Sequence, residues 1–600
     1  MRRLLVFRPV EQVLRCAAGL LLVGALPVPG RAQAPPVDWA VPCASGPAPY
    51  VWGPSKLVVD RQGNTYVAGA FNGTTVIGPG SLTAVPSTDG AYAGDVFVAK
   101  LNAQGQYLWA VSAGGNKLDM IKGLAVDALG DVYVTGSFES FSLGFGAGGP
   151  VLFNSSARSE WFVAKLSGAT GQWLWARRAG GAYADEGTGI AVNAAGEVYV
   201  TGNIAGPSGT ACDVGPFALA PVGGGDVVVA KLSPSGAWLW ARNCGGAVTE
   251  QATALLLDSA GNLYVTGSFY FLTGQPITTQ LGPSTFRATP VVGCPTPNRP
   301  GDLFVGKLDG AGNWLWAVQG DAVNGQNLAG TVGLTADGLG HLYVAGIYAN
   351  QSVRLGPFVL PNLSVMQPPL VPGPPVPYTN NYHTDVFVAR LDAATGAWQW
   401  AVRAGGSQHD YLGTIAADPQ GRVYVGARGR PGVFEGFANP LAPSGGPVYS
   451  AELAGATGAW RWTAPEGAWT LATDATGRLY VGSNFDGAAV TLGTTTLASA
   501  GPGLTTGYVM RRAAGPLSAG VAAPGTGGLM VWPNPAGARE VWVQGAPAGA
   551  TVDVLDLLGR PVFHGRTPGT GPLRVALPLP VGAGMYVVRS GRQTQKVLVQ

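Results

Sequence analysis

The sequence predicts an all-β protein in two parts, a seven-bladed β-propeller with four-stranded blades and, after it, a small C-terminal β-sandwich. Short apolar runs separated by turn residues fill the chain, and 93 glycines among 600 residues suit a fold dense in turns. One unit of four such runs recurs seven times, and repetition of this kind is typical of propellers. The fourth run of the unit is displaced by one copy along the chain, which indicates a closed ring.

The repeat unit is clearest between residues 123 and 181. Its four runs are 124–126, 132–136, 161–166 and 173–176. The turn 127–130 joins the first two runs, because Asp127 can accept hydrogen bonds from its own turn and Gly130 can supply a left-handed backbone. Tyr, Phe, Trp and Val fill the runs, and these residue types suit half-buried pleated strands. Each unit is therefore expected to form one four-stranded blade.

Aromatic residues mark the copies of the unit. The second-run tyrosines each stand six residues after an Asp or Asn, at Tyr66, Tyr133, Tyr199, Tyr264, Tyr343, Tyr424 and Tyr480. The fourth-run tryptophans are Trp39, Trp109, Trp175, Trp240, Trp316, Trp400 and Trp462. The run at Trp39 precedes every other element, and no equivalent follows the third run at Tyr508. We therefore expect the N-terminal strand to complete the last blade and to remove its exposed edge.

The pattern VDxxGNxYVTGxF followed by DxFVAKLxxxGxWxWA resembles the bacterial secreted β-propeller repeat known as the SBBP repeat. The resemblance covers about residues 38–512 and rests on several copies at fixed spacing. Turns of the form LxxATGxWxW, at Leu166, Leu391 and Leu453, are similar to quinoprotein-type propeller repeats. These resemblances imply a secreted propeller, which we place at residues 35–512.

The N-terminus has the pattern of a secretory signal peptide. Four arginines precede the apolar stretch 17–28, and the small-residue site Ala32-Gln33-Ala34 follows it. The apolar stretch is shorter than the roughly 20 residues that a membrane-spanning helix needs. We therefore expect residues 1–34 to be removed after Ala34, no transmembrane segment in the chain, and a protein that reaches the cell surface or the medium through the periplasm.

Charge argues against one class of partner. The chain has 36 Lys and Arg against 33 Asp and Glu, a net charge of +3. Nucleic-acid binding needs clustered cations, and no basic run follows the N-terminal leader. No nucleic-acid partner is expected.

Four cysteines follow the leader, namely Cys43, Cys212, Cys244 and Cys294. An even number in an exported chain allows disulfides, with three connectivities. Two of them lie at the exit of a fourth strand and two lie between a second and a third strand, and both places belong to the same face of a blade. Small buried thiols are the alternative interpretation.

The chain changes character after Arg512. Residues 513–530 form a Gly/Pro/Ala/Ser linker without periodicity, and alternating apolar runs resume at 531–600, which predicts a compact antiparallel sandwich. The pattern PNPA…VxVxDxLGRxV…LPxGxYxVR…KVLV is similar to the type A C-terminal sorting domain of the type IX secretion system. The resemblance implies the secretion machinery as a partner, export across the outer membrane of a Bacteroidota-type bacterium, and surface attachment or release.

The connections between second and third runs are long and unequal, whereas the turns between first and second runs keep one length. Within them a shorter echo recurs, such as 77–79 and 143–145, which we expect to form a small extra hairpin. Variable loops on a rigid scaffold are where binding sites usually lie. The two longest connections, 268–303 and 347–386, carry aromatics that could stack on sugar rings or pack against their own loop: Tyr270, Phe271, Tyr348, Tyr378 and Tyr382.

The sequence predicts no catalytic residue, no metal site and no cofactor. Each Asp-x-x-Gly turn offers one carboxylate, whereas Ca²⁺ needs about 6–8 converging oxygens. No HExxH, GxSxG or phosphate-binding glycine loop occurs, and the chain lacks the adjacent cysteines used by many quinoprotein dehydrogenases. The carboxylates that could contribute to glycosidase chemistry are Glu139, Asp185, Glu186, Glu250 and Asp410. The acids that recur before the third-run aromatic are expected to form blade-to-blade hydrogen bonds, at Asp95, Glu160, Asp226, Asp302 and Asp385.

These features favour a non-catalytic, secreted or surface-displayed propeller that binds a glycan or a protein through its long-loop face. Two alternatives remain open at this stage. One is a carbohydrate-active enzyme, a lyase or hydrolase, with carboxylates in the mouth of the ring. The other is a purely structural surface protein.

Overall fold

The computed structural model describes residues 34–43, 51–87, 94–156, 158–246, 248–270, 278–287, 300–323, 329–349, 352–362, 383–405, 409–429, 433–434, 437–438, 448–464, 466–499, 501, 505–514, 530–532, 540–544, 550–556, 560–566, 573–576, 584–590 and 593–599. The chain divides into two units, Met1–Ala514 and Gly515–Gln600. The secondary structure of the described residues consists of strands and turns. Among these residues no helix is long and apolar enough to cross a membrane. The predicted signal peptide and most of the predicted linker lie outside the described residues.

The strands of the first unit pair in antiparallel groups of four, called blades below. In chain order the blades are β2 (Val51–Val59), β3 (Thr65–Phe71), β6 (Asp95–Leu101) and β7 (Tyr107–Ala113); β8 (Asp119–Val126), β9 (Val132–Phe138), β12 (Glu160–Leu166) and β13 (Trp173–Gly181); β14 (Glu186–Val192), β15 (Val198–Ala205), β18 (Gly225–Leu232) and β19 (Trp238–Asn243); β20 (Thr249–Leu257), β21 (Leu263–Tyr270), β24 (Pro300–Leu308) and β25 (Trp314–Val323); β26 (Ala329–Ala336), β27 (His341–Tyr348), β30 (Asp385–Asp392) and β31 (Trp398–Gly405); β32 (Asp410–Ala417), β33 (Arg422–Gly429), β36 (Val448–Ala454) and β37 (Trp460–Ala464); and β38 (Thr470–Thr473), β39 (Leu479–Asp486), β42 (Thr505–Arg512) and β1 (Val37–Pro42).

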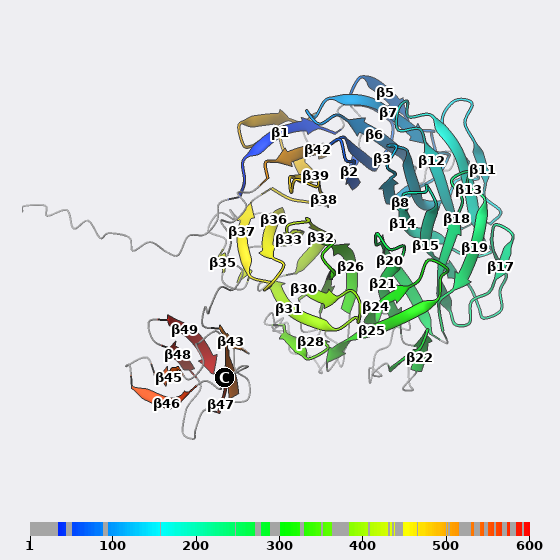
Figure 1. Cartoon of the computed structure of the whole chain (residues 1–600). Helices are drawn as coiled ribbons and strands as arrows, with labels where there is room; N and C mark the ends of the chain where they lie inside the picture. The colour runs from blue at the N-terminus through cyan, green and yellow to red at the C-terminus, as the bar shows by residue number, and fades with distance from the viewer. Residues whose placement is uncertain are drawn as a thin grey trace, which may run out of the picture. The chain divides into compact units, whose positions relative to one another are not determined.

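The first strand of each blade lies at the centre of a ring. These inner strands contact one another in a full circle, β2 with β8, β8 with β14, β14 with β20, β20 with β26, β26 with β32, β32 with β38 and β38 with β2. Figure 1 shows the same arrangement, with the blades fanning outward from the inner strands. The first unit is therefore a β-propeller.

The N-terminal strand belongs to the last blade. β1 pairs antiparallel with β42, with Trp39 opposite Arg511 and Val41 opposite Val509. In Figure 1 the blue β1 lies beside the orange-brown β42. This pairing confirms the expectation drawn from the displaced fourth run.

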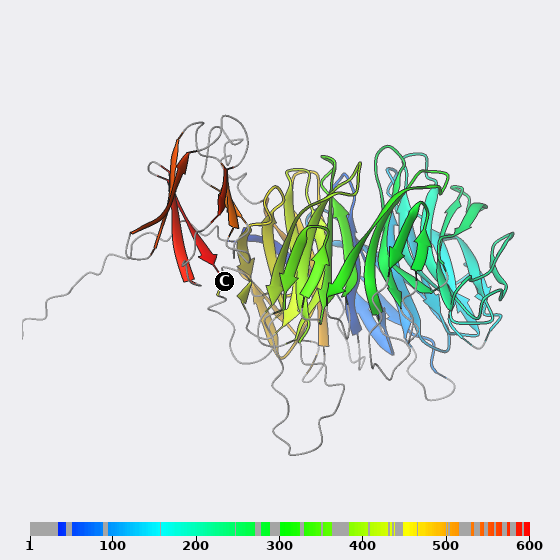
Figure 2. The same cartoon turned by 90° about the horizontal axis from the view of Figure 1, so that it is seen from below.

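Two faces of the propeller carry different connections, and Figure 2 shows the strands running between them. The turn face carries the short turns between first and second strands and between third and fourth strands. The loop face carries the connections from second to third strands and from each fourth strand to the next blade. On the loop face the predicted echoes form hairpins, which confirms that expectation: β4 (Thr74–Ile77) with β5 (Gly80–Thr83), β10 (Ser142–Gly144) with β11 (Val151–Phe153), β16 (Cys212–Val214) with β17 (Phe217–Leu219), β22 (Thr278–Leu281) with β23 (Ser284–Arg287), β28 (Ser352–Leu355) with β29 (Phe358–Pro361), β34 (Val433–Phe434) with β35 (Phe437–Ala438), and β40 (Ala489–Leu492) with β41 (Thr495–Ala498).

The Asp turns are structural. Asp127 Oδ1 accepts hydrogen bonds from the amides of Leu129 and Asp131, both at 2.9 Å, and its Oδ2 accepts from the Tyr133 hydroxyl at 3.0 Å. Gly130 has φ of 86°, in the left-handed region that glycine adopts without steric cost. The turn thus uses its carboxylate completely, as the sequence predicted.

The turn face also holds neighbouring blades together. The Tyr66 hydroxyl donates to Gly130 O in the next blade at 3.1 Å. Trp109 Nε1 and Lys100 Nζ both donate to Gly168 O, at 3.2 and 2.7 Å. Because the same residue types recur in each unit, this one sequence pattern builds both the blade and its contact with the next blade.

Apolar side chains fill the space between blades. Every residue of β3 and β9 is buried, because each of these second strands has a blade on both sides. The core clusters combine residues of adjacent blades, as where Tyr66 and Trp109 of one blade pack with Val134 and Phe162 of the next. Burial on both faces explains why the second runs read as continuous apolar segments.

The second unit consists of two antiparallel sheets. One contains β43 (Met530–Trp532), β44 (Glu540–Gln544) and β47 (Leu573–Ala576), and the other contains β46 (Pro561–Arg566), β45 (Thr551–Leu555), β48 (Gly584–Ser590) and β49 (Gln593–Val599). Val552 and Val554 of β45 and Val588 of β48 are fully buried. Their alternation with more exposed neighbours fits strands that bury one face.

Candidate ligand-binding site

The inner strand of the last blade is shorter than the others. β38 has four residues, whereas β8 has eight. In the second blade the inner strand continues past its bulge, so that Met120 lies opposite Ser137. In the last blade the register ends with Thr470 opposite Gly482. The inner strand of the last blade is therefore several residues shorter than the inner strand of the second blade.

Trp469 takes the place of the missing strand. Its amide donates to Gly482 O of β39 at 3.0 Å. Its indole Nε1 donates to Asn484 Oδ1 at 2.7 Å, and this hydrogen bond orients the ring. The side chain keeps 37% of its surface exposed, which is a large fraction for a tryptophan beside the axis of a ring.

A pocket of about 330 Å³ lies beside this indole. Its lining residues are Gly53, Pro54, Ser55, Gly413, Trp469 and Asn484. They come from β2, β32 and β39 and from the residue before β38, so the pocket lies at the axis of the propeller. All of them lie on the half of their strand nearest the loop face. We call this site the axial pocket.

Two glycines let the walls of the axial pocket approach closely. A Cβ at Gly53 would lie 3.2 Å from Asn484 Cβ. A Cβ at Gly413 would lie 2.6 Å from Ala468 O, closer than real side chains pack. Gly413 also stands at the bulge of β32, between Leu412 and Thr414. Glycine at these positions therefore keeps the pocket open and the neighbouring backbones in contact.

The lining of the axial pocket carries no charged side chain. Its polar groups are the Ser55 hydroxyl, the Asn484 amide and the Trp469 indole N–H. Farther round the inner ring Lys122 pairs with Glu186, and burial, with the nearby charge of Lys122, lowers the pKa of Lys56. The pocket itself is thus apolar with a few hydrogen-bonding groups, the usual composition of a site for a neutral ligand.

None of the residues expected from the sequence to bind a ligand lines this pocket, although the sequence contains a signal for it. Trp109 precedes Tyr133 by 24 residues, and Trp400 precedes Tyr424 by the same number. Trp462 precedes Tyr480 by only 18 residues. This segment is therefore six residues shorter, and it contains both β37, with five residues against eight in β31, and β38, with four residues against eight in β8.

The structure corrects one of the predicted loop aromatics. Tyr348 is fully buried, its hydroxyl donates to Pro361 O at 3.2 Å, and its ring packs against Phe387. It supports the blade and is not available to a ligand. Tyr270 ends β21, where only its backbone is described, and Phe271, Tyr378 and Tyr382 lie outside the described residues.

Three of the four cysteines that follow residue 34 are free. Cys43, Cys212 and Cys244 are buried thiols, and no disulfide joins them. Burial raises the pKa of Cys43 and Cys244 to about 12. Cys294 lies outside the described residues. For the three described cysteines the structure agrees with the alternative of small buried side chains.

Blade-to-blade hydrogen bonds are expected for the recurring acids at the start of the third strands, and the contacts that the structure gives for the described acids lie within their own blades. Asp226 Oδ2 accepts from Val222 N at 2.8 Å and from Asn243 Nδ2 at 2.6 Å, both in its own blade. Glu160 pairs with Arg178 of its own blade at 2.8 Å. The remaining contacts of this class also stay within a blade: Asp95 with Val85, Asp302 with Gln319, and Asp385 with Arg403. The Tyr, Trp and Lys side chains of the turn face make the links between blades instead.

The carboxylates considered for catalysis lie in different surroundings. Asp185, Glu250 and Asp410 are buried at the starts of inner strands or just before them, and Glu186 is held by Lys122. Glu139 is exposed after the end of β9. None of them lines the axial pocket. Within the described residues no three His, Cys, Asp or Glu side chains come together as a metal site.

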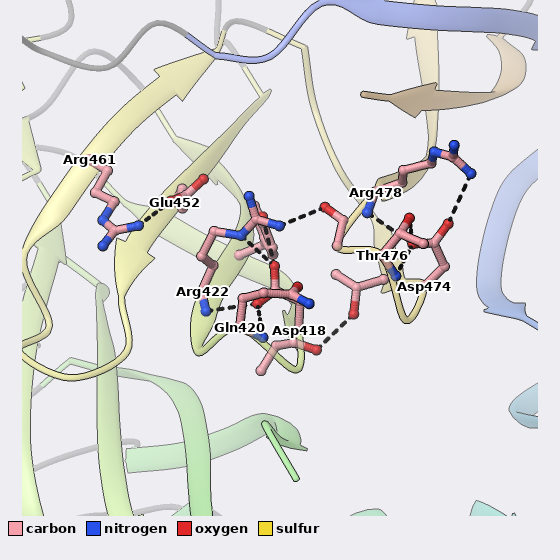
Figure 3. A network of polar contacts seen from close by, with 12 residues as sticks. Asp418, Gln420, Arg422, Glu452, Arg461, Asp474, Thr476 and Arg478 are labelled. Atoms are coloured by element: carbon pink, nitrogen blue, oxygen red, sulfur yellow. Dashed lines mark hydrogen bonds and ion pairs between the residues drawn. The ribbon is translucent and has the colours of Figure 1, made fainter. Parts of the chain in front are cut away.

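A network of charged side chains on the turn face links the last two blades, as Figure 3 shows. Arg422 Nε contacts Asp418 Oδ2 at 2.5 Å, and Arg422 Nη2 donates to Gly477 O at 3.0 Å. Glu452 accepts from Arg461 Nη1 at 3.1 Å and from Trp462 Nε1 at 2.7 Å. The ion pairs Arg422–Asp418 and Arg461–Glu452 lie within the sixth blade, and the hydrogen bond from Arg422 to Gly477 O joins this network to the last blade.

Comparisons with known proteins give distant structural neighbours among solved structures. No protein-family model matches the sequence, and no curated protein matches it. A quinohemoprotein alcohol dehydrogenase from Comamonas testosteroni is 14% identical with a TM-score of 0.36, over 83% of this chain and 78% of that one. The Neurospora crassa Pan2 WD40 domain is 8% identical with a TM-score of 0.35, over 80% and 97%. A europium-containing methanol dehydrogenase is 12% identical with a TM-score of 0.32, over 80% and 93%. At these values no activity is transferred to this chain.

Proposed function

We propose that this chain is a secreted or cell-surface β-propeller, closed as seven blades, that binds a neutral glycan at the axial pocket without a catalytic step. The observation that carries the proposal is the partly exposed indole of Trp469 beside a pocket of about 330 Å³. This volume lies at the lower end of ligand sites, which run from about 300 to 1,000 Å³. It suits a terminal sugar better than a protein surface.

The lining matches the chemistry of a sugar. A pyranose ring has an apolar C–H face, which stacks on an aromatic ring, and hydroxyls at its rim, which need hydrogen-bond partners. Trp469 offers the aromatic face, and its position is fixed by the hydrogen bond to Asn484. Asn484 and Ser55 offer the polar partners. Because no lining side chain is charged, a neutral sugar is favoured over a uronic or sialic acid.

The place of the pocket supports the same function. Repeated contacts stabilise every blade, whereas a single ligand needs a place where the repeat is broken. The shortened inner strand breaks it at one point, between β2, β32 and β39. This place also differs from the site expected on the longest loops, since its walls are the inner strands β2 and β32, the second strand β39 and Trp469.

The test is a glycan array followed by calorimetric titration of the best ligand. Trp469→Ala should weaken binding by at least about tenfold, which equals ~1.4 kcal/mol, because the stacking surface is lost. Asn484→Ala should weaken it less, since the ring remains. Phe141→Ala is the control, because Phe141 is an aromatic residue of the second blade that is 69% exposed and does not line the pocket. Unchanged affinity in both pocket variants would refute the axial site.

The proposed route of export is the type IX secretion system, through a C-terminal sorting domain at residues 531–600. The sequence pattern of this segment supports it, and so do the two antiparallel sheets of the second unit, which suit a small sandwich. The N-terminal pattern of residues 1–34 supports passage through the inner membrane. The partner implied by this proposal is the secretion machinery.

A further inference from the structure

A second exposed aromatic residue lies on one of the strands that form the axial pocket. Tyr411 is the second residue of β32 and keeps 49% of its surface exposed. Gly413, two residues farther along the same strand, lines the axial pocket. A strand rises by about 3.3 Å per residue, so Tyr411 and Gly413 are separated by roughly 6–7 Å along β32. Tyr411 is therefore close enough to the axial pocket to contact a ligand that extends out of it.

The strand register places Tyr411 at the loop-face end of the axis, called the mouth below. Its partner in β33 is Arg428, which comes four residues after the second-strand tyrosine of the sixth blade. Ser137 has the same place in the second blade, and its inner-strand partner Met120 is 41% exposed. Inner strands of different blades thus present an exposed side chain at this height.

Trp469 reaches the same height in the last blade. Asn484 comes four residues after Tyr480, which is the place that Arg428 has in the sixth blade. The Trp469 indole donates to Asn484 Oδ1 at 2.7 Å, so this side chain also lies at the mouth. The inner strands β32 and β38 are neighbours around the ring. Two exposed aromatic side chains therefore occupy neighbouring blades at one height.

The alternation of side chains along β32 assigns Tyr411 to the face of the strand that meets the last blade. Leu412 packs in one cluster with Tyr343 of the fifth blade. Successive side chains of a strand lie on opposite faces, so Tyr411 belongs to the other face. On that side Gly413 approaches the last blade, because a Cβ at Gly413 would lie 3.3 Å from Trp469 Cα.

Other side chains hold the Tyr411 ring in place. It lies nearly parallel to the His409 ring, with 21° between the planes and 6.0 Å between the centroids. His409 Nδ1 accepts from Thr384 N at 3.1 Å, and the His383 ring packs edge-on against His409 with a centroid distance of 4.5 Å. A side chain that is ordered before binding loses little conformational freedom when a ligand arrives. The exposed part of Tyr411 is thus a pre-formed surface.

We propose that the site takes a neutral oligosaccharide of at least two sugars, with the first sugar against Trp469 in the axial pocket and the second stacked on Tyr411. This inference rests on the proposed function and adds a second subsite to it. Each aromatic ring can stack on the apolar face of one sugar, and the short separation along β32 suits consecutive sugars of a chain. The charged pair Lys122–Glu186 lies in the second and third blades, away from both aromatic residues. The ligand is therefore a chain of uncharged sugars that enters from the mouth.

The experiment is calorimetric titration of the full chain with neutral sugars of increasing length. The probes are glucose with maltose and cellobiose, N-acetylglucosamine with chitobiose, and mannose with mannobiose. The wild type should bind the disaccharide of its preferred sugar at least about tenfold more tightly than the monosaccharide. Tyr411→Ala should remove this gain and keep the monosaccharide affinity, whereas Trp469→Ala should weaken both. Tyr411→Phe should keep the gain, because the ring remains.

Met120→Ala is the matched control, since Met120 has the equivalent register position in the second blade and is also exposed. It should keep the wild-type gain, and thermal melts should show that all variants are folded. Equal wild-type affinity for the monosaccharide and the disaccharide would overturn the second subsite and leave the axial site standing. A gain that survives in Tyr411→Ala, or that Met120→Ala also removes, would overturn it as well. If the wild type bound none of the probes, the proposed function itself would be contradicted, and this inference with it.

Discussion

Removing residues 35–42 should open the ring, since β1 completes the last blade. β1 pairs with β42 from Val37 to Pro42, and its deletion leaves β42 as an unpaired edge. Trp39 is the largest side chain lost. Its indole N–H donates to Ala103 O at 3.2 Å, and its ring packs edge-on against Tyr480 with a centroid distance of 6.2 Å.

The cost of this deletion is comparable with the whole stability of a domain. Replacing a buried Trp by Ala costs about 3–5 kcal/mol, and the half-buried Trp39 should lie near the lower end, at ~3 kcal/mol. The lost ladder hydrogen bonds add about 0.5–1.5 kcal/mol each. Together they approach the ~5–15 kcal/mol that separates folded from unfolded domains. The variant should therefore unfold at a much lower temperature and associate through its open edge.

Calorimetric melting and light scattering would measure both effects. Trp39→Phe provides a graded comparison, because it keeps an aromatic ring and loses the hydrogen bond to Ala103, for a cost of ~1 kcal/mol. Trp109→Ala is the matched control, since Trp109 has the same role in a blade whose strands are continuous in sequence. A deletion variant that stays monomeric and melts with the wild type would show that β1 does not close the ring.

Two further predictions follow from the turn face and from the second unit. Tyr133→Phe removes the hydroxyl that donates to Asp127 at 3.0 Å, so thermal unfolding should show a loss of ~1.5–3 kcal/mol while glycan affinity, measured by titration, stays at the wild-type value. A drop in affinity would contradict the purely structural role of the turns. Truncation after Arg512 should leave the propeller folded, because the two units are separate, and cell fractionation should find the product in the periplasm. Normal amounts at the surface or in the medium would refute the sorting role of 531–600.

Most of the fold could be predicted from the sequence because one physical pattern is repeated. The Asp turn, the second-strand Tyr and the fourth-strand Trp recur at fixed spacing, and similar contacts recur in most blades, as with Asp127 and Tyr133 or with the Trp109 and Trp400 indoles, which both donate to a backbone oxygen of the next blade. The first halves of the inner strands were not predicted. In β8 the segment 119–123 contains Asp119, Lys122 and Gly123 and lacks apolar alternation, since it faces the axis and a neighbouring blade. Its partners are distant in sequence, and periodicity reports only local patterns.

The candidate site was harder to predict, because reasoning from a repeat concentrates on what the copies share. The long loops indicate Tyr348 as a ligand-binding residue, but its hydroxyl donates to Pro361 O and its ring packs against Phe387. The recurring acids predict hydrogen bonds between blades, yet Asp226 accepts a hydrogen bond from Asn243 and Glu160 forms an ion pair with Arg178, each within its own blade. Both errors have the same cause. A residue type and its position in a repeat unit do not specify which way a side chain points when a blade has neighbours on two sides.

A closed ring of repeats has a physical consequence for where a ligand can bind. Contacts that recur around the ring stabilise it and are already occupied, as at the Asp turns, so they offer little free hydrogen-bonding capacity to a ligand. Shortening the inner strand β38 makes hydrogen-bonding groups available to a ligand. The neighbouring strand β39 continues past the end of its pairing with β38 and carries a polar side chain there. Asn484 is that side chain, and Trp469, the residue just before the shortened strand, holds it at 2.7 Å. The six residues missing between Trp462 and Tyr480 therefore create a pocket and supply its polar group in one step. The loss costs the ring little stability, since the last blade still has β39, β42 and β1 in register and β38 still contacts both of its inner neighbours.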